Sequence, residues 1–449
     1  MIPCSAAEIC RAVGGTLLQD ADAAVTNVST DSRTAAAGDL FIPLVGEKFD
    51  GHAYLDGALA RGAAGCLTMH APTALQPGKF YILVDDTLLA LRALASWYRG
   101  RFTLPVVQIT GSAGKTTTKE MVAAVLAQRF ETLKTEANYN NHIGAPLTLL
   151  RLTPEHRAAV LETGMNHFGE IRYLGEMVRP DIAVITNVGD AHIENLGGTR
   201  AGTLRAKSEI FENLSPDGIA VLNGDDELLD TVTLPQNILR CGLSAHCNVR
   251  VSEVEDLGID GIRCVVTTEK ERYALAIPAP GKHMVYAAAM AAAIGEYLGE
   301  TKEEIERGVA AYEPAGSRMH VIALSENRRL LDDCYNAGPQ SMAASLRVLA
   351  ASSGKKAAVI GDMAELGDLT ESAHREIGEL TKELGIDTVI AIGARAKNYL
   401  EGNGSVQWFQ SVEEAMDAIK AVFAADTAML VKASHSMHFE TIVEELTKA

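Results

Sequence analysis

The stretch "LPVVQITGSAGKTTTKEMVAAVLAQRF", residues 104–130, constrains the fold more than any other part of the chain. A β-branched apolar run is followed by a glycine-rich turn and then by apolar residues at helical spacing. This order predicts a buried strand, a tight loop and a helix. The first N–H groups of such a helix point at phosphate, where Lys115 would reach the terminal phosphates and the Thr116 hydroxyl would bind magnesium. We therefore predict an ATP- or GTP-binding loop, the alternative being an ordinary turn rich in glycine and threonine.

The loop lacks the first glycine of the commonest phosphate-binding pattern, because Ile109 occupies that place. What remains is the shorter form T-G-x-x-G-K-T. This form still supplies the glycines, the lysine and the hydroxyl on which phosphate binding depends.

The length of 449 residues is too great for one hydrophobic core and suggests about three domains. A composition of 47% hydrophobic and 22% charged residues is typical of a soluble globular enzyme. The net charge of −18 argues against nucleic-acid or anionic-membrane partners, which require a basic face. Scattered cysteines without a C-x-x-C pair predict reduced thiols. Without a signal peptide or a membrane-length apolar run, we expect a cytoplasmic protein.

The order of apolar runs predicts an α/β protein. The amino-terminal part, ending near residue 85, reads as a small α/β unit, and residues 86–102 as a connecting helix. From residue 104 onward, apolar runs alternate with helices, which is typical of a parallel sheet covered on both faces. After a β-rich excursion at 248–278 and an expected linker at 312–320, the pattern restarts as a third, doubly wound domain.

Polar residues follow several of the central apolar runs. Glu162 ends one run, Thr186 and Asn187 end the next, and Asn223 and Asp225 follow another. Because open α/β sheets bind ligands at the carboxyl ends of their strands, these side chains should share one edge. Magnesium prefers one or two carboxylates with phosphate oxygens and water, so Glu162 and the Thr116 hydroxyl could share an ion.

Further candidates each have a plain structural alternative. Asn138, Asn140 and Asn141 crowd the segment after a strand, where they bind a ligand or form a polar turn. His192 lies in a loop expected at the same edge, and a single histidine is often structural. Lys207 lies on an amphipathic helix, where a lysine is normally solvated.

The third domain contributes "LLDDCYNAGPQSM". Asp333 ends a strand, Tyr335 and Asn336 follow it, and Pro339 opens a helix. This layout suits contacts with ribose or phosphate, but also an ordinary turn.

Taken together, the motifs resemble those of the Mur ligases. The segments "TGSAGKTTTKE", "EANYNN", "ETGMNHFGEI", "TNVGDAH", "AKSEIF", "GSRMH" and "DDCYNAGPQSM" occur in that family's order, and the match covers nearly the whole chain. "DSRTAAAGDLFIPLVGEKFDGHAYLDGA" and "VIGDMAELG" are most similar to the member that adds D-alanyl-D-alanine to UDP-N-acetylmuramoyl-tripeptide in peptidoglycan precursor synthesis. The resemblance implies an ATP-dependent amide ligase that uses Mg²⁺ and an acyl-phosphate intermediate.

The resemblance also implies three domains. Residues 1–85 would form the small α/β domain that binds the UDP-sugar-peptide. Residues 86–313 would form the central ATP-binding domain, a parallel sheet of the P-loop ATPase type, and residues 314–449 a Rossmann-like carboxy-terminal ligase domain. We expect a monomer with UDP-N-acetylmuramoyl-tripeptide and D-alanyl-D-alanine as its partners, and neither nucleic acid nor a membrane.

Site residues follow from the resemblance. The catalytic residues would be Lys115, Glu162, His192 and a carbamylated Lys207. The metal ligands would be Thr116, Glu162, His192 and Lys207. The nucleotide contacts would be Thr110, Gly111, Ser112, Ala113, Gly114, Lys115, Thr116, Thr117, Asn138, Asn141, His283, Arg318 and Asp333. The substrate contacts would be Ser32, Arg33, Lys48, Asp50, Gly51, His52, Asn166, Tyr335 and Asn336.

The chain departs from the family pattern at three positions. Met284 and Ala287 stand where asparagines usually contact adenine, and His435 replaces an arginine in "KASHS". These departures suggest, as an alternative, a nucleotide-binding protein without ligase activity, although Lys115, Glu162, His192 and Lys207 are retained. The other alternative is the same chemistry on another substrate, by another Mur-type or a folylpolyglutamate synthase-like ligase. "VIGDMAELG", in place of the D-N-P-R signature, argues against the ligase that adds the third residue.

Overall fold

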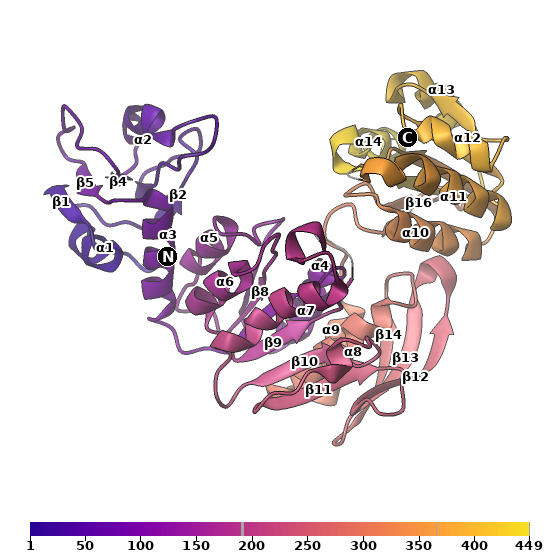
Figure 1. Ribbon diagram of the computed structural model, residues 1–449, viewed down its shortest axis with the longest axis horizontal. Coiled ribbons are helices and arrows are strands. Elements are labelled where there is room, and N and C mark those ends of the chain that lie inside the picture. Colours follow the sequence, from indigo (N-terminus) through magenta and orange to yellow (C-terminus); the bar gives the residue numbers. More distant parts are fainter. Residues whose placement is uncertain (190–192, 365, 449) are drawn as a thin grey trace. The chain divides into compact units, whose positions relative to one another are not determined.

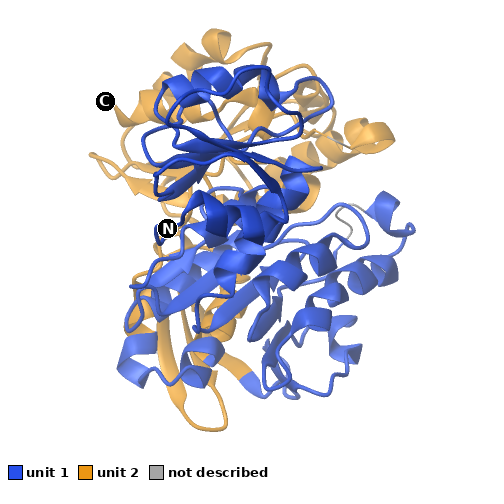
Figure 2. Ribbon diagram, turned by 90° about the vertical axis from the view of Figure 1, so that its left-hand side faces the viewer, with its two compact units in different colours: residues 1–249, 293–305 blue, residues 250–292, 306–449 orange. Residues whose placement is uncertain are grey.

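The computed structural model describes residues 1–189, 193–364 and 366–448. The chain forms two compact units, residues 1–249 with 293–305 and residues 250–292 with 306–449 (Figure 2). Both contain parallel strands with intervening helices, which confirms the α/β class. The domain bounds at residues 85 and 313 stay a prediction.

The amino-terminal sheet has the strand order β1-β5-β4-β3-β2, with β1 antiparallel to β5 and the other pairs parallel. Its elements are α1 (Ala6–Val13), β1 (Thr16–Gln19), β2 (Asn27–Ser29), β3 (Asp39–Phe41), α2 (Leu55–Ala60), β4 (Gly65–Thr68) and β5 (Phe80–Leu83). Ser5 and Glu8 form a capping box at the start of α1, and Gly14 ends the helix with φ of 66°.

The central sheet places the strand before the loop between its neighbours. The parallel order is β11-β10-β9-β6-β8-β7. Figure 1 labels β8, β9, β10 and β11 of this sheet. The strands are β6 (Val106–Thr110), β7 (Thr132–Lys134), β8 (Ala158–Glu162), β9 (Ile182–Ile185), β10 (Ile219–Asn223) and β11 (Asn237–Gly242). The helices are α4 (Lys115–Leu126), α5 (Gly144–Leu150), α6 (Glu170–Val178) and α7 (Arg200–Ser208). Because β6 lies between β8 and β9, the carboxyl ends of those two strands flank the loop.

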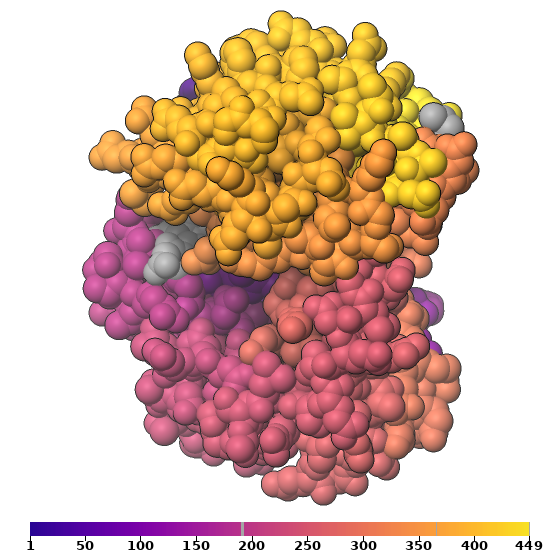
Figure 3. Space-filling view, turned by 90° about the vertical axis from the view of Figure 1, so that its right-hand side faces the viewer, coloured from indigo at the N-terminus to yellow at the C-terminus, as the bar shows by residue number. Residues whose placement is uncertain are grey.

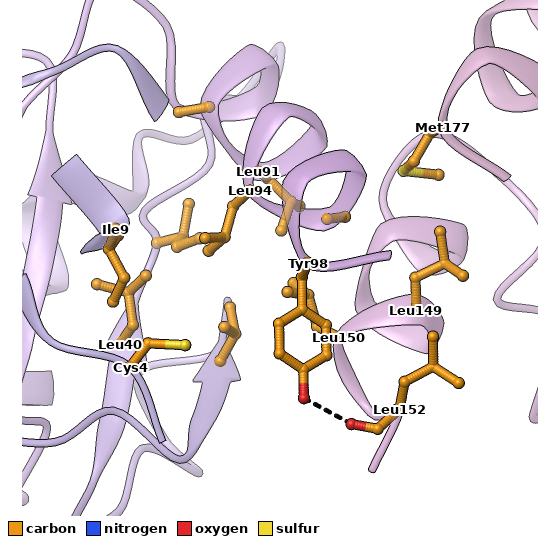
Figure 4. Packing of buried hydrophobic residues seen from close by; sticks show 14 of the residues in the cluster. Cys4, Ile9, Leu40, Leu91, Leu94, Tyr98, Leu149, Leu150, Leu152 and Met177 are labelled. Carbon is orange, nitrogen blue, oxygen red and sulfur yellow. Dashed lines mark hydrogen bonds between the residues drawn. The ribbon is translucent and has the colours of Figure 1, made fainter. Parts of the chain in front are cut away.

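One hydrophobic cluster connects the amino-terminal elements with the central sheet of the first unit (Figure 4). Helix α3 (Thr87–Arg99) contributes Leu91, Leu94 and Tyr98, all fully buried. The Tyr98 hydroxyl donates to the Leu152 carbonyl at 2.6 Å and accepts from the Ile2 N–H, so its polar end is satisfied inside the core.

The second unit begins with an antiparallel meander of β12 (Val249–Asp256), β13 (Ile262–Thr267) and β14 (Arg272–Ile277). Exposed and buried residues alternate along β14, as the period-2 pattern predicts. Helices α8 (Met284–Tyr297) and α9 (Lys302–Ala310) follow, and their residues 293–305 belong to the first unit.

The 3₁₀ turns among the described residues are η1 (Gly51–Tyr54), η2 (Ile193–Leu196), η3 (Glu209–Asn213), η4 (Leu229–Thr231), η5 (Gly258–Asp260), η6 (Gly367–Leu369), η7 (Ala396–Asn398) and η8 (His435–Met437).

The carboxy-terminal residues, orange to yellow in Figure 3, form a doubly wound sheet of order β15-β16-β20-β17-β18-β19. Its strands are β15 (His320–Ala323), β16 (Arg329–Asp332), β17 (Lys355–Gly361), β18 (Thr388–Ile392), β19 (Gln407–Phe409) and β20 (Thr427–Lys432). The helices are α10 (Pro339–Ala351), α11 (Thr370–Glu383), α12 (Tyr399–Gly402), α13 (Val412–Val422) and α14 (Glu440–Thr447). The expected linker runs directly into β15, an antiparallel edge strand that the sequence did not reveal because it is short and half-exposed.

None of the helices in the described residues is long and apolar enough to cross a membrane. All seven cysteines of the sequence, each within a described range, are unpaired thiols.

Candidate functional site

The glycine-rich loop connects β6 to α4, as predicted, and its glycines have distinct roles. A Cβ at Gly111 would lie 1.9 Å from the Thr186 hydroxyl oxygen, so only glycine fits beside the end of β9. Gly114 has φ of 77° and is the N-cap of α4, a conformation that favours glycine. The loop therefore turns directly into the amino-terminal end of α4.

The end of β9 holds this loop in place. The Asn187 side-chain oxygen accepts from the N–H groups of Ser112 at 3.1 Å and Ala113 at 2.9 Å. The Thr186 hydroxyl donates to the Ala113 carbonyl at 2.6 Å. Thr186 and Asn187 were expected at this edge of the sheet, but their role in supporting the loop was not predicted.

Positive charge gathers at the start of α4. The Lys115 ammonium donates to the Gly111 carbonyl at 2.8 Å and so lies back over the loop. Together with the N–H groups of the first helical turn, it makes this end of α4 electropositive. An anion such as a phosphate is the ligand that this arrangement favours.

The carboxylate at the end of β8 faces the loop helix. The Thr116 hydroxyl donates to Glu162 Oε2 at 2.8 Å, and Asn140 Nδ2 donates to Glu162 Oε1 at 2.9 Å. Thr116 and Glu162 are 4% and 3% exposed, so the carboxylate is buried and held from both sides. Asn140, which was missing from the predicted contacts, is the asparagine of its cluster that reaches the carboxylate.

These oxygens fit magnesium. A hard cation takes oxygen ligands, and Mg²⁺ is commonly held by one or two carboxylates together with phosphate oxygens and water. Within the described ranges there is no group of three or more His, Cys, Asp or Glu side chains that could hold a metal alone. The Thr116–Glu162 pair thus suits an ion that arrives with a phosphate ligand.

The other predicted asparagines do not contact this carboxylate. The Asn141 side-chain oxygen accepts from the N–H groups of Ile143 and Gly144, at 3.0 and 2.9 Å, and thereby supports the start of α5. Asn138 is exposed on the same turn. Their predicted nucleotide contacts stay predictions.

Lys207 is not a solvated surface lysine, so that alternative is wrong. On α7 it is 3% exposed, and burial, assisted by the nearby Lys115 charge, lowers the pKa of its amine to about 7. Half or more of the amine is therefore neutral near physiological pH. This burial could not be predicted from the sequence, because α7 is short and carries several charged residues.

Two further candidates from the central segments remain. His192 lies outside the described residues. Asn166 is exposed after β8, and its N–H donates to Glu170 Oε2 at 2.6 Å.

The predicted uridine-nucleotide residues lie in two loops of the amino-terminal sheet. Arg33 makes a two-nitrogen pair with Asp31 and lowers the pKa of that carboxyl to about 2, while the neighbouring Ser32 is half-buried. Asp50 caps η1 and accepts a 2.6 Å hydrogen bond from His52 Nδ1.

His52 and its neighbours form the second of these loops. His52 Nε2 accepts from the Met69 N–H at 3.0 Å, so the proton of the neutral ring lies on Nδ1. A Cβ at Gly51 would come within 2.8 Å of the Leu44 carbonyl oxygen, which explains the glycine. Lys48 is exposed.

In the second unit, the Asp333 carboxylate accepts three hydrogen bonds from protein groups. It accepts from the Met319 N–H at 3.0 Å, from the Ser345 hydroxyl at 2.6 Å and from the Lys432 ammonium at 2.5 Å. The Lys432 side chain is 3% exposed. Asp333 thereby ties the segment around Arg318 to β20 and α10.

An aromatic and cationic group lies beside this ion pair. The Arg318 guanidinium carbon is 3.8 Å from the centre of the Tyr335 ring, and the His435 ring centre is 5.7 Å from that of Tyr335. The Asn336 carbonyl accepts from Lys432 at 2.9 Å. His283 directly precedes α8 and is exposed. The structure thus brings Arg318, Asp333, Tyr335 and Asn336 together, and His435 with them.

Comparisons with known proteins agree with these features. Family models described as the Mur ligase family catalytic domain, the Mur ligase middle domain and the Mur ligase glutamate ligase domain match residues 24–127, 109–295 and 317–435. These matches confirm the three-domain α/β organisation and the resemblance that the motifs indicate.

Relatives match along the whole chain. The UDP-N-acetylmuramoyl-tripeptide–D-alanyl-D-alanine ligase of Escherichia coli is 38% identical over 96% of this chain and 95% of its own length. The enzyme of the same name from Bacillus subtilis is 36% identical over 100% and 99%. A crystal structure of MurF from Acinetobacter baumannii has 33% identity and a TM-score of 0.93, covering 100% of this chain and 99% of its own. MurF from Thermotoga maritima in complex with ADP has 27% identity, a TM-score of 0.82 and coverage of 94% and 97%.

Proposed function

This chain belongs to the Mur ligase family, and from that premise we propose that it is the ATP-dependent ligase that joins D-alanyl-D-alanine to UDP-N-acetylmuramoyl-tripeptide in peptidoglycan precursor synthesis. The observation that carries the proposal is the agreement of nearly the whole chain with relatives named for that one activity, at 36–38% identity. The similarity to folylpolyglutamate synthase, at 17% identity, extends to the fold alone.

The reaction must make a carboxylate reactive towards an amine. A carboxylate oxygen of the tripeptide attacks the γ-phosphorus of ATP, the bond from that phosphorus to the β–γ bridging oxygen breaks, and ADP leaves. The amine of D-alanyl-D-alanine then attacks the acyl-phosphate carbon. The bond from that carbon to the phosphate oxygen breaks and the amine loses a proton, so that an amide and inorganic phosphate remain.

The loop residues act mainly by positioning and neutralising charge. We place the phosphates at the amino-terminal end of α4, where the N–H groups of the loop and the Lys115 ammonium lie. To reach the γ-phosphate, Lys115 exchanges its hydrogen bond to the Gly111 carbonyl for one to phosphate. The hydrogen bonds that Asn187 and Thr186 make with the loop hold it in its conformation, in which the glycine at position 111 lets the loop pass close to Thr186.

Thr116 and Glu162 are the proposed magnesium ligands. When bound, Mg²⁺ would neutralise charge on the phosphates during transfer. The hydrogen bond from Asn140 orients the Glu162 carboxylate, so that its other oxygen stays directed at α4.

Lys207 is the proposed carbamylation site. A neutral amine is the form that reacts with carbon dioxide, and the buried amine, with a pKa of about 7, is largely neutral at physiological pH. Formation of the N–C bond and loss of a proton convert this neutral amine into a carbamate anion near Lys115. We assign this carbamate and His192 to a second magnesium, following the family resemblance.

The remaining assignments follow the proposed domains. In this division residues 1–85 hold the UDP-sugar-peptide through Ser32, Arg33, Lys48, Asp50, Gly51 and His52. Residues 314–449 supply Arg318 and Asp333 towards the nucleotide and Tyr335 and Asn336 towards the substrates. Asn166 is assigned to the substrate from the central domain.

The test is phosphate release with Mg²⁺, ATP and both peptide substrates, with mass spectrometry of the product. We expect a UDP-linked pentapeptide and one phosphate per amide formed, and neither without D-alanyl-D-alanine. Efficient addition of single amino acids, or of glutamate to a folate, would assign the chain to a different ligase. Nucleotide binding without any product would indicate a non-catalytic relative.

A further inference from the structure

Lys119 is a buried cation that the phosphate-binding pattern does not use. It lies on α4 one turn after Lys115 and Thr116, and its side chain is 1% exposed. A lysine ammonium at such a position is strongly unfavourable unless charged and polar partners surround it. Its partners therefore show what the residue does.

The Lys119 ammonium connects α4 to the end of β7. It donates to the Thr135 carbonyl at 2.6 Å and lies 2.8 Å from Glu120 Oε1. The other oxygen of Glu120 pairs with Lys134, the last residue of β7. Lys119 thus compensates the charge of Glu120 and fixes the main chain just after β7.

Thr135 in turn holds the backbone of Glu162. Fully buried, it accepts a hydrogen bond from the Glu162 N–H at its hydroxyl oxygen, at 3.0 Å. Its own N–H donates to the Val160 carbonyl at 3.1 Å. The path from Lys119 to Glu162 therefore consists of two hydrogen bonds through one buried threonine.

One face of α4 consequently reaches Glu162 by two routes. Thr116 and Lys119 are three residues apart, so their side chains lie on the same side of the helix. Thr116 contacts the Glu162 carboxylate directly, whereas Lys119 acts through Thr135 on its main chain.

We propose that Lys119 is a positioning residue for the magnesium–nucleotide site. By fixing the main chain of Thr135, it holds the main chain of Glu162 in the position from which the carboxylate accepts a hydrogen bond from the Thr116 hydroxyl. The inference rests on one part of the proposed function, namely that Thr116 and Glu162 hold the metal that accompanies the nucleotide.

The test compares Lys119→Met and Thr135→Val with Lys134→Met. Lys134 pairs with the same glutamate, but its side chain is 46% exposed and it does not donate to Thr135, which makes it the matched control. For each purified protein, calorimetry gives the affinity for ADP in EDTA, and electron paramagnetic resonance gives the affinity for Mn²⁺ in the presence of ADP.

We expect Lys119→Met to weaken Mn²⁺ binding by about tenfold, the loss of roughly one oriented hydrogen bond, while ADP affinity in EDTA changes less than about twofold. Thr135→Val should act in the same direction. The double variant should be no weaker than about the worse single variant, because both changes interrupt one path. Lys134→Met should bind Mn²⁺ like the unchanged protein.

A folded Lys119→Met protein with a lowered Tm but unchanged Mn²⁺ affinity would overturn the proposal, as would equal losses in Lys134→Met. If Lys119→Met does not fold, Thr135→Val tests the second hydrogen bond of the same path, because it keeps the ion pair and removes only the hydroxyl; unchanged Mn²⁺ affinity in this variant would also overturn the proposal. Absence of pentapeptide formation by the unchanged protein would refute the proposed function, but the Mn²⁺ affinities would still test Lys119.

Discussion

The Thr116 hydroxyl donates to the Glu162 carboxylate at 2.8 Å, although 46 residues separate the two. The strand register accounts for this meeting, because Ile109 of β6 pairs with Glu162 of β8. The carboxylate therefore stands level with the beginning of the loop that carries Thr116. The parallel pairing of β6 with β8 therefore brings the two proposed metal ligands together.

Glu162→Gln should abolish most of the ligase activity while leaving the fold intact. The amide keeps the shape and can still accept from Thr116, but it removes the negative charge that Mg²⁺ requires. We expect kcat to fall by about 100-fold or more, as for loss of a group that stabilises transition-state charge. Phosphate release measured against Mg²⁺ concentration checks this.

Threonine 116 provides the matched comparison for that experiment. Thr116→Ser keeps the hydroxyl and should retain most activity, whereas Thr116→Val keeps the shape and should lose it. Equal activities for the serine and valine variants would contradict a role for this hydroxyl in metal binding.

Lys207→Ala should lose most turnover but still bind ADP. The loss follows from the missing carbamate, because the phosphate loop is unchanged. Intact mass and kinetics in bicarbonate, with and without a small added carboxylate, check the prediction. Partial rescue by the carboxylate is expected, and Lys207→Glu should be poor because its carboxylate stops several bonds short. A fully active alanine variant would show that the buried amine has no part in the reaction.

The sequence predicted the elements whose signals are local. The apolar run, glycines and helical spacing around residues 104–130 placed the strand, the loop and α4 correctly. Glu162 was correctly expected at the end of a strand. The sequence also predicted that this carboxylate lies near Thr116, because the carboxyl ends of parallel strands share one edge of the sheet.

Burial on one helix face could not be predicted in the same way. Lys119 and Lys207 look like solvated helix lysines, and only the packing of α4 and α7 buries them. Likewise, the support of the loop by Asn187 depends on the order of β6 and β9 in the sheet. That order is long-range information, which a local pattern does not contain.

Replacement of two family asparagines should relax the choice of nucleotide. Met284 and Ala287 are 4% and 5% exposed. Because both side chains are apolar, neither offers the hydrogen bonds that an asparagine would offer to adenine. Each lost hydrogen bond is worth about 0.5–1.5 kcal/mol, or roughly two- to tenfold in affinity. We expect GTP or CTP to support turnover at a measurable fraction of the ATP rate. Strict ATP preference, equal to that of a Met284→Asn, Ala287→Asn variant, would show that other groups read the base.

The Asp333–Lys432 ion pair should be a major support of the second unit. Asp333→Ala would leave the Lys432 ammonium, 3% exposed, without its carboxylate. Breaking a buried pair in this way costs about 3–5 kcal/mol, whereas replacing both partners costs less. Thermal unfolding should therefore show a larger fall in Tm for Asp333→Ala than for Asp333→Asn combined with Lys432→Met. The reverse order would show that the ion pair does not stabilise the fold.

Glu300 should make the stability of the first unit depend on pH. The side chain is 7% exposed, and neither carboxylate oxygen has a hydrogen-bond partner among the described residues. A Cβ at Gly295 would lie 3.1 Å from Glu300 Oε2 and 2.8 Å from Val125 at the end of α4, which shows how closely the group is packed. Burial first, and the charge of Glu304 second, raise the pKa of Glu300 to about 8, against a smaller opposing effect of Arg129.

A raised pKa means that the folded protein binds this proton more tightly than the unfolded chain does. Its contribution is therefore fully present below the unfolded value of 4.5 and is lost as the pH rises through about 8. Glu300→Gln, which resembles the protonated acid, should leave Tm nearly unchanged at pH 5 and raise it by several degrees at pH 8.5. Scanning calorimetry at both values measures the difference, with Glu304→Gln as the control that should shift the transition only slightly. A Tm difference between Glu300→Gln and the unchanged protein that stays constant from pH 5 to 8.5 would mean that Glu300 does not ionise in this range.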